Sequence, residues 1–138
     1  MIEIINELYT IEENFFVEKL EKIVSELKLE GAITVKIGDE EESLHLNKEY
    51  RKRDYPADVL SFSFNEDLPD GFYLGDVFVC YPIAVAQAKE NNISLEEELF
   101  TLMVHGILHL AGHDHETDSG EMLLKQDELI KAYFQPKK

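Results

Sequence analysis

One apolar helix constrains the fold more than any other part of the chain. Residues 94–112 read SLEEELFTLMVHGILHLAG, where Ser94 and Glu97 have the spacing of a capping box and Gly112 is the expected helix-ending residue. The apolar run inside this segment is shorter than the roughly 18–20 residues of a membrane-spanning helix, and it carries two histidines. We therefore expect a central, buried core helix and no membrane association.

Four strands and four further helices are expected around this helix. Alternating apolar and polar residues predict the strands, and apolar residues three or four apart predict the helices. The order of elements, βαβαββααα, predicts one α+β domain over residues 1–138, with a roughly four-stranded mixed sheet packed by helices. The predicted strands are 1–8, 32–39, 58–65 and 73–80, the predicted helices are 11–30, 40–54, 82–92, 94–112 and 120–134, and residues 66–71 are a predicted loop.

Charge limits the partners of this chain. Its formal net charge of −16 excludes nucleic-acid binding by bulk electrostatic attraction, so a polyanion has to meet a local positive patch. Both arginines of the chain and two of its lysines lie in KEYRKRD, residues 48–54. This cluster is either such a patch or a solvated helix end, where cations favour the helix dipole.

Cysteine usage and the N-terminal sequence bear on the cellular compartment. Cys80 is the single cysteine, which excludes an internal disulfide and is compatible with a reducing cytosol. The first residues carry early acids and no basic region, so they do not resemble a signal peptide. We expect a cytoplasmic protein in which Cys80 is a small buried apolar residue.

Four of the five histidines lie in HGILHLAGHDH, residues 105–115. His105 and His109 are one helical turn apart, so both imidazoles lie on one face and can reach one ion. The glycine that ends the helix lets His115 approach from another side. His113 is the alternative third ligand, but residues two apart in a turn point differently, and we prefer His115. Three imidazoles favour one Zn²⁺ per chain, placed at the end of the central helix.

An open fourth position is typical of a catalytic zinc site. Cys80 could close the site as a structural ligand, but it lies in a predicted strand interior. Asp114 either orients an imidazole or only shapes the turn. The histidine spacing also occurs in metzincin proteases, which have a glutamate as general base after the first histidine. Here Gly106 takes that position, so peptide hydrolysis by that route is excluded, and the glycine suggests close approach of another element or of substrate.

The histidine segment resembles the H-G-x-L-H-L-x-G-[YH]-D-H signature of the YbeY family of bacterial endoribonucleases. Residues 46–64, LNKEYRKRDYPADVLSFSF, are similar to the family's L-N-x-x-Y-R-x-x-D-x-P-T-[DN]-V-L-S-F-P-F segment. Residues 74–80, LGDVFVC, resemble its L-G-D strand, and residues 115–129 resemble its acidic segment after the last histidine. The chain departs from the pattern at Ala57, Ser63 and His113. None of these departures falls on His105, His109 or His115, or on Arg51 in the Y-R-x-x-D part of the pattern.

This resemblance implies a zinc-dependent, single-strand-specific endoribonuclease. Its implied role is 3′-end maturation of small-subunit ribosomal RNA and ribosome quality control. The resemblance also implies His105, His109 and His115 as the zinc ligands and Arg51 as the functional arginine. The planar guanidinium of an arginine presents several N–H donors in a fixed arrangement, which matches the oxygens of a phosphodiester.

Flanking phosphates are the expected partners of Lys48 and Arg53. Because the acidic chain should bind RNA poorly by itself, we expect single-stranded ribosomal RNA to be presented by the ribosome or a protein partner. The general base stays open: zinc hydroxide could serve, or the ribose 2′-hydroxyl could attack in place of water. Asp58 and Asp76 stand near strand ends, but they could equally be turn or capping residues, and the sequence does not place them in the site.

Two other classes of function remain as alternatives. One is a metal hydrolase acting on a peptide or a small ester. The other is a non-catalytic, zinc-containing ribosome assembly factor, in which the metal is structural.

Overall fold

The predicted central helix is α4 in the computed structural model, which describes residues 1–112 and 120–134. Ser94 accepts a hydrogen bond from the backbone N–H of Glu97, and Gly112 has a φ of +97°, so both ends are built as predicted. The described residues form the elements β1 (Ile2–Asn6), α1 (Glu13–Glu26), β2 (Ala32–Gly38), α2 (Glu40–Arg51), β3 (Val59–Leu68), β4 (Gly71–Cys80), α3 (Tyr81–Asn91), α4 (Leu95–Leu110) and α5 (Glu121–Tyr133).

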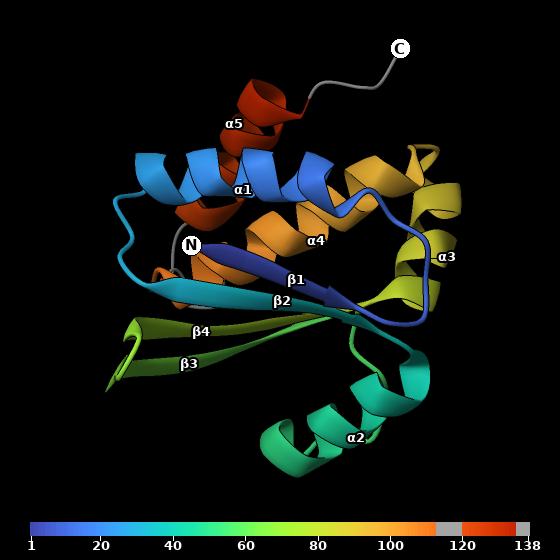
Figure 1. The fold of residues 1–138 in the computed structure, drawn as a ribbon. Coiled ribbons are helices and arrows are strands. Elements are labelled where there is room, and N and C mark those ends of the chain that lie inside the picture. Colours follow the sequence, from blue (N-terminus) through green and yellow to red (C-terminus); the bar gives the residue numbers. More distant parts are fainter. Residues whose placement is uncertain (113–119, 135–138) are drawn as a thin grey trace.

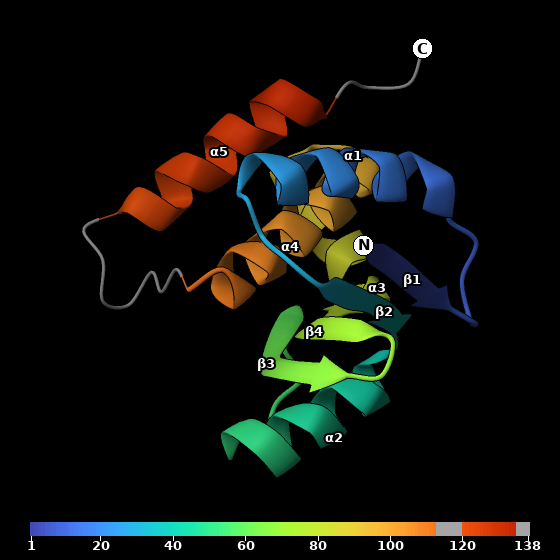
Figure 2. The same ribbon diagram turned by 60° about the vertical axis from the view of Figure 1, so that its left-hand side comes forward.

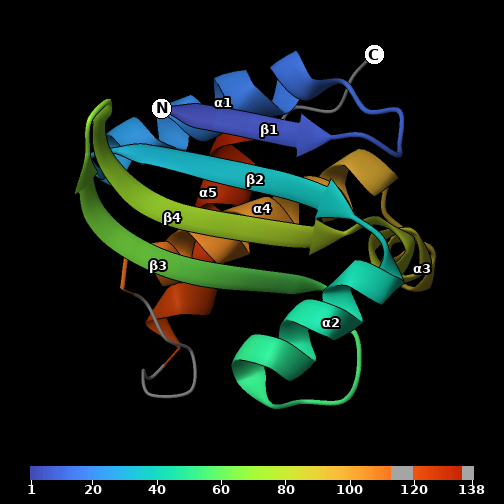
Figure 3. The ribbon, with the colours of Figure 1, turned by 60° about the horizontal axis from the view of Figure 1, so that its bottom comes forward.

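These elements confirm the predicted α+β fold with one mixed sheet. The strand order is β1-β2-β4-β3, with β1, β2 and β4 parallel and β3 antiparallel to β4 (Figure 3). One row of paired residues crosses the sheet from Ile4 through Val35 and Val77 to Ser61. β3 is therefore an edge strand, and Ser61 brings a hydroxyl to the end of an otherwise apolar row.

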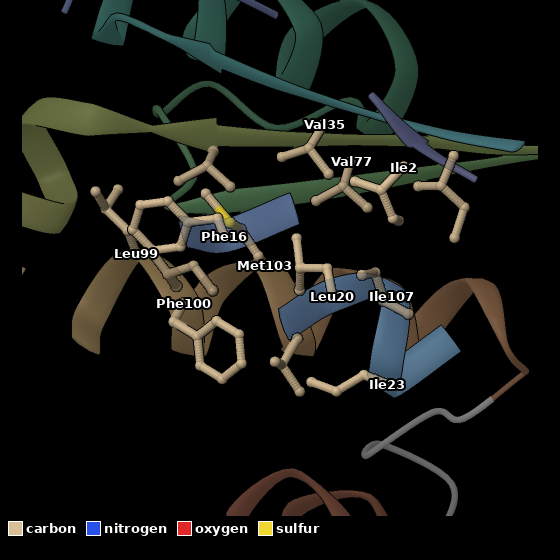
Figure 4. Packing of buried hydrophobic residues seen from close by; sticks show 14 of the residues in the cluster. Ile2, Phe16, Leu20, Ile23, Val35, Val77, Leu99, Phe100, Met103 and Ile107 are labelled. Atoms are coloured by element: carbon tan, nitrogen blue, oxygen red, sulfur yellow. The ribbon is translucent and has the colours of Figure 1, made fainter. Parts of the chain in front are cut away.

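Helices α1, α4 and α5 cover one face of the sheet, and α2 lies on the other face (Figures 1 and 2). The main core lies between the sheet and α4, where Val35 and Val77 face Met103 and Ile107 (Figure 4). All four of these side chains are buried, as predicted for a central helix. No helix among the described residues is long and apolar enough to span a membrane.

Gly106 lets α4 pack closely on the sheet. A Cβ atom at this position would lie only 2.4 Å from Cγ1 of Val77 and 3.2 Å from Oγ of Ser61. The glycine expected to permit the close approach of another element therefore does so, and that element is the sheet. A larger residue would push the helix and its histidines away from β3 and β4.

A second apolar cluster fills the space between the sheet and α2. Leu60, Phe78 and Cys80 form it, and Leu46 of α2 packs against them. Burial raises the pKa of the Cys80 thiol to about 11, which keeps it protonated at neutral pH. Cys80 is thus the buried apolar residue predicted, and its protonated thiol is a poor metal ligand.

The β3–β4 hairpin and the end of α2 differ from the predicted boundaries. Residues 66–71 are mostly strand rather than loop, because a register shift beside Asn65, which has a φ of +50°, lets pairing resume with Glu66 opposite Tyr73. Helix α2 ends at Arg51, where Lys52 adopts a left-handed conformation, ahead of the predicted end. This early end produces the loop that forms one side of the site.

Candidate active site

A cavity of about 530 Å³ opens beside the edge strand β3. Arg51 of α2 and His105 and His109 of α4 all line it, together with the loop after α2, β3 itself and α3. Figure 3 shows why these elements meet: α2 lies in front of the sheet, α4 lies behind it, and β3 is the edge between them. The structure therefore brings the predicted arginine and two predicted zinc ligands to one place.

The α4 side of the cavity carries the two histidines. The ring centroids of His105 and His109 are 4.8 Å apart, with an angle of 69° between the ring planes. The hydroxyl of Ser61 donates a hydrogen bond of 2.9 Å to the backbone carbonyl of Gly106, which ties β3 to the helix between the two histidines. Close packing and this hydrogen bond fix the position of both imidazoles relative to β3.

Helix α5 contributes Gln126, whose Oε1 lies 2.8 Å from Nδ1 of His105. An amide oxygen only accepts hydrogen bonds, so Nδ1 is the donor in this contact. Metal-binding histidines usually have such a partner on the second ring nitrogen. Gln126 is thus placed to orient the ring of His105.

Arg51 is the last residue of α2 and is anchored to β3. Its guanidinium donates a hydrogen bond to the backbone carbonyl of Ser61 and lies 5.6 Å from the ring centroid of Phe62. Ser61 thus contacts Arg51 through its carbonyl and α4 through its hydroxyl. The edge strand holds the arginine in register with the histidine helix.

The other predicted cations separate in the structure. Arg53 lines the cavity, whereas Lys48 is not among its lining residues and pairs with Asp54 at 3.5 Å on the surface. Among residues 1–112 and 120–134, the charged residues that line the cavity, apart from the histidines, are Arg51, Arg53 and Asp58. The described lining thus brings both arginines of this acidic chain to one cavity.

Of the two aspartates considered, Asp58 belongs to the cavity. Its carboxylate accepts hydrogen bonds from the backbone N–H of Val59 at 2.8 Å and from the side chain of Gln87 at 3.3 Å. Asp76 instead accepts a hydrogen bond from the hydroxyl of Tyr73 and is not among the lining residues. The charge of Asp58 also acts on Glu98, a buried residue of α4. Burial, and secondly the negative charge of Asp58, raises the pKa of the Glu98 carboxyl group.

Within the described residues, the imidazole nitrogens of His105 and His109 are the metal-binding groups of the cavity that suit a zinc ion. Two imidazoles on one helical turn are borderline donors of the kind zinc prefers. The third predicted ligand, His115, lies outside the described residues, as do His113 and Asp114. Residues 1–112 and 120–134 by themselves contain no group of three His, Cys, Asp or Glu side chains placed to hold an ion.

Sequence reasoning missed several residues of this site, among them Tyr55, Gln126 and Ser61. Ser61 and Gln126 reach the histidine helix through contacts between elements far apart in the chain, and Tyr55 lines the cavity from the loop after α2. One local feature of the sequence pointed to the loop beside the cavity. Ser43 and Asn47 are four residues apart in α2, on the same side of the helix as Leu46, which packs toward the sheet. Polar residues on a buried helix face need hydrogen-bond partners, and these two find theirs in the loop beside the cavity.

Comparison with known proteins places the chain in a family. The family model for "Endoribonuclease YbeY" matches residues 2–134. The chain is 43% identical over 119 residues to the protein of that name from Sulfurihydrogenibium sp. (strain YO3AOP1), covering 85% of this chain and 78% of the relative. It is 38% identical over 134 residues to that of Persephonella marina (strain DSM 14350 / EX-H1), covering 91% and 88%.

A solved structure has the same fold. The solution structure of TM1509 from Thermotoga maritima superposes with a TM-score of 0.67 at 36% sequence identity, covering 95% of this chain and 87% of that chain. The match includes the histidine helix, the arginine segment and the whole sheet. The chain belongs to the YbeY endoribonuclease family.

Proposed function

We propose that this protein is a zinc-dependent endoribonuclease that cleaves single-stranded ribosomal RNA, in 3′-end maturation of the small-subunit RNA and in ribosome quality control. Membership of the YbeY endoribonuclease family supports RNA cleavage. One observation carries the assignment to this site: Arg51 and the His105–His109 pair line one cavity although they come from opposite faces of the sheet. A phosphodiester placed there meets both.

The zinc ion would be held by His105, His109 and His115. Bound there, it would supply Lewis-acid polarisation of the phosphodiester. The contact between Gln126 Oε1 and Nδ1 of His105 would orient the ring so that Nε2 is the nitrogen that binds the metal. Packing of α4 around Gly106 holds the two imidazoles in place before any ligand binds.

Arg51 would stabilise the negative charge that develops on the non-bridging oxygens of the phosphate in the transition state. Its hydrogen bond to the Ser61 carbonyl orients the guanidinium in advance, so little ordering is needed on binding. Among the described residues that line the cavity, Asp58 is the one carboxylate, and its two hydrogen bonds fix its orientation. It is our candidate to accept the proton of the attacking hydroxyl or water.

Metal removal and product analysis test this proposal. Protein stripped by a chelator should lose cleavage of unstructured RNA and regain it with Zn²⁺. Products ending in a 2′,3′-cyclic phosphate would assign attack to the ribose 2′-hydroxyl, and simple phosphate ends would assign it to water. Cleavage of peptides or small esters without cleavage of RNA would overturn the proposal in favour of another metal hydrolase.

The acidic surface supports a role on RNA that is presented by a larger assembly. A net charge of −16 opposes long-range attraction of RNA, and both arginines of the chain line the cavity. We expect weak binding of RNA by the isolated protein and faster cleavage when ribosomal particles present the substrate. Tight, sequence-independent RNA binding at physiological salt would contradict this part.

A further inference from the structure

The loop that follows α2 is held by hydrogen bonds from two buried polar side chains of that helix. The side-chain amide of Asn47 donates a hydrogen bond of 2.7 Å to the carbonyl of Tyr55. The hydroxyl of Ser43 donates to the carbonyl of Ala57 at 2.6 Å and accepts from its N–H at 2.8 Å. Both polar side chains are buried, Asn47 at 2% and Ser43 at 0% exposure. Helix α2 thus fixes the loop backbone on both sides of Pro56.

This rigid backbone presents an exposed aromatic ring. The side chain of Tyr55 is 52% exposed although its carbonyl is anchored in the interior. The guanidinium of Arg53 donates a hydrogen bond of 3.2 Å to the Tyr55 hydroxyl, which steadies the ring from its polar end. An exposed ring on a fixed backbone at the cavity can meet a ligand with little ordering on binding.

Tyr55 and Arg53 line the same cavity as Arg51, His105 and His109. From this placement we infer that Tyr55 and Arg53 form a nucleobase subsite, in which an unpaired base of the RNA stacks on the Tyr55 ring next to the cleaved phosphodiester. The inference rests on the proposed ribonuclease function and names how that site recognises its substrate.

Stacking on this ring gives a physical reason for single-strand preference. Every base has a π-face, so stacking on an aromatic side chain is independent of sequence. A base within a duplex is already stacked and paired, and it would have to leave the helix to reach Tyr55. Arg53 adds a positive charge for the adjoining phosphate or for the edge of the base. The subsite would therefore select for unpaired RNA rather than for a sequence.

A fluorescence experiment tests the contact directly. The chain has no tryptophan, so the Tyr55→Trp variant carries a single indole while keeping an aromatic ring. Titration of the zinc-loaded variant at low ionic strength, with a short unstructured RNA up to concentrations that saturate cleavage, should quench this fluorescence, and a duplex of the same composition should quench it much less. Tyr50→Trp is the matched control, because Tyr50 is also an exposed tyrosine, at 64%, but does not line the cavity. Equal quenching in both variants, or none in Tyr55→Trp, would overturn the inference.

Steady-state kinetics separate this inference from the proposed function. Tyr55→Ala should raise KM for single-stranded RNA by roughly 5- to 150-fold, the range for one lost base–aromatic stack, with a smaller change in kcat. Tyr55→Phe should stay within a few-fold of wild type, and Tyr50→Ala should be unchanged. If wild type cleaves RNA and Tyr55→Ala cleaves it with the same KM, the subsite is wrong and the function stands. Absence of RNA cleavage by zinc-loaded wild type would instead remove the function.

Discussion

The two sides of the cavity hold their functional side chains by different means. On the α4 side, His105 and His109 stand on a buried helix whose position is fixed by apolar packing, with Gly106 against Val77. On the loop side, exposed side chains stand on a backbone fixed by hydrogen bonds from buried polar groups of α2. Packing is sensitive to volume, and hydrogen bonding is sensitive to a single lost partner.

This difference implies that each side can be disturbed without the other. Damage to α4 should affect the metal and the overall stability together, because the helix is also the centre of the core. Damage to the loop should affect substrate binding and leave the metal in place. The variants of Gly106, Gln126 and Asn47 below test this separation, and Glu98→Gln tests the burial of α4.

The largest effect is expected for Gly106→Ala. The new Cβ would lie 2.4 Å from Cγ1 of Val77, a stiff core side chain, so the helix or the sheet has to shift. We expect the free energy of unfolding to fall by about 1–3 kcal/mol, as for other overpacked cores. Urea denaturation measures this loss. In a double-mutant cycle with Val77→Ala, the two losses should be less than additive, and full additivity would mean that the contact is not the cause.

Gln126→Ala should weaken the metal site without touching the core. Loss of the acceptor on His105 Nδ1 frees the ring to rotate and to change tautomer, which should lower zinc affinity about 10- to 100-fold. Competition with a chelating dye measures this affinity. Gln126→Glu, which keeps an acceptor, should recover most of it, and the exposed Asp127→Ala on the same helix should have no effect. Unchanged affinity in Gln126→Ala would exclude its positioning role.

On the loop side, Asn47→Ala removes the donor to the Tyr55 carbonyl. Because a buried hydrogen bond is lost, we expect the free energy of unfolding to fall by about 1–2 kcal/mol. We also expect a higher KM for RNA and an unchanged zinc affinity, which is the opposite pattern to Gln126→Ala. The exposed Glu49→Ala on α2 is the control. A matching loss of zinc affinity would show that the two sides are not independent.

The smallest effect concerns Glu98, which lies buried in α4. Its pKa is raised by burial and then by the charges of Asp58 and Glu97, so the folded state binds this proton more tightly than the unfolded state. Stability therefore falls as pH rises from the ordinary glutamate pKa of 4.5 through the raised value. Glu98→Gln should be more stable than wild type above this window and equal to it below.

Denaturation at several pH values measures that gain. The exposed Glu49→Gln should show no pH-dependent difference from wild type. A stability difference for Glu98→Gln that is the same at low and neutral pH would contradict the assignment to ionisation and point to a change in packing.

Much of the α4 side was predictable from the sequence. Helical periodicity, the Ser94 cap and the helix-ending Gly112 are local signals, and they located the buried helix and the two histidines on one face. Gly106 could be expected to allow a close approach, but the sequence did not tell whether a strand or a substrate makes it. That answer depends on the pairing that places Val77 and Ser61 beside each other.

The loop side was less predictable, because its contacts join elements that local pattern does not connect. The basic cluster predicted a patch, yet only the early end of α2 at Arg51 decides that Arg53 reaches the cavity while Lys48 stays on the surface. In the sequence, Tyr55 is one of six tyrosines, with no local feature that marks it. Its role depends on the buried hydrogen bond from Asn47, which periodicity cannot reveal.

Zinc content measured alongside RNA cleavage tests the central claim most directly, using wild type, Arg51→Ala and His109→Ala. If the two sides form one active site, Arg51→Ala keeps its zinc and loses cleavage, while His109→Ala stays folded and loses both. Unfolding of His109→Ala would instead indicate a structural metal in a non-catalytic assembly factor. Cleavage at the wild-type rate by either variant would contradict the proposed active site.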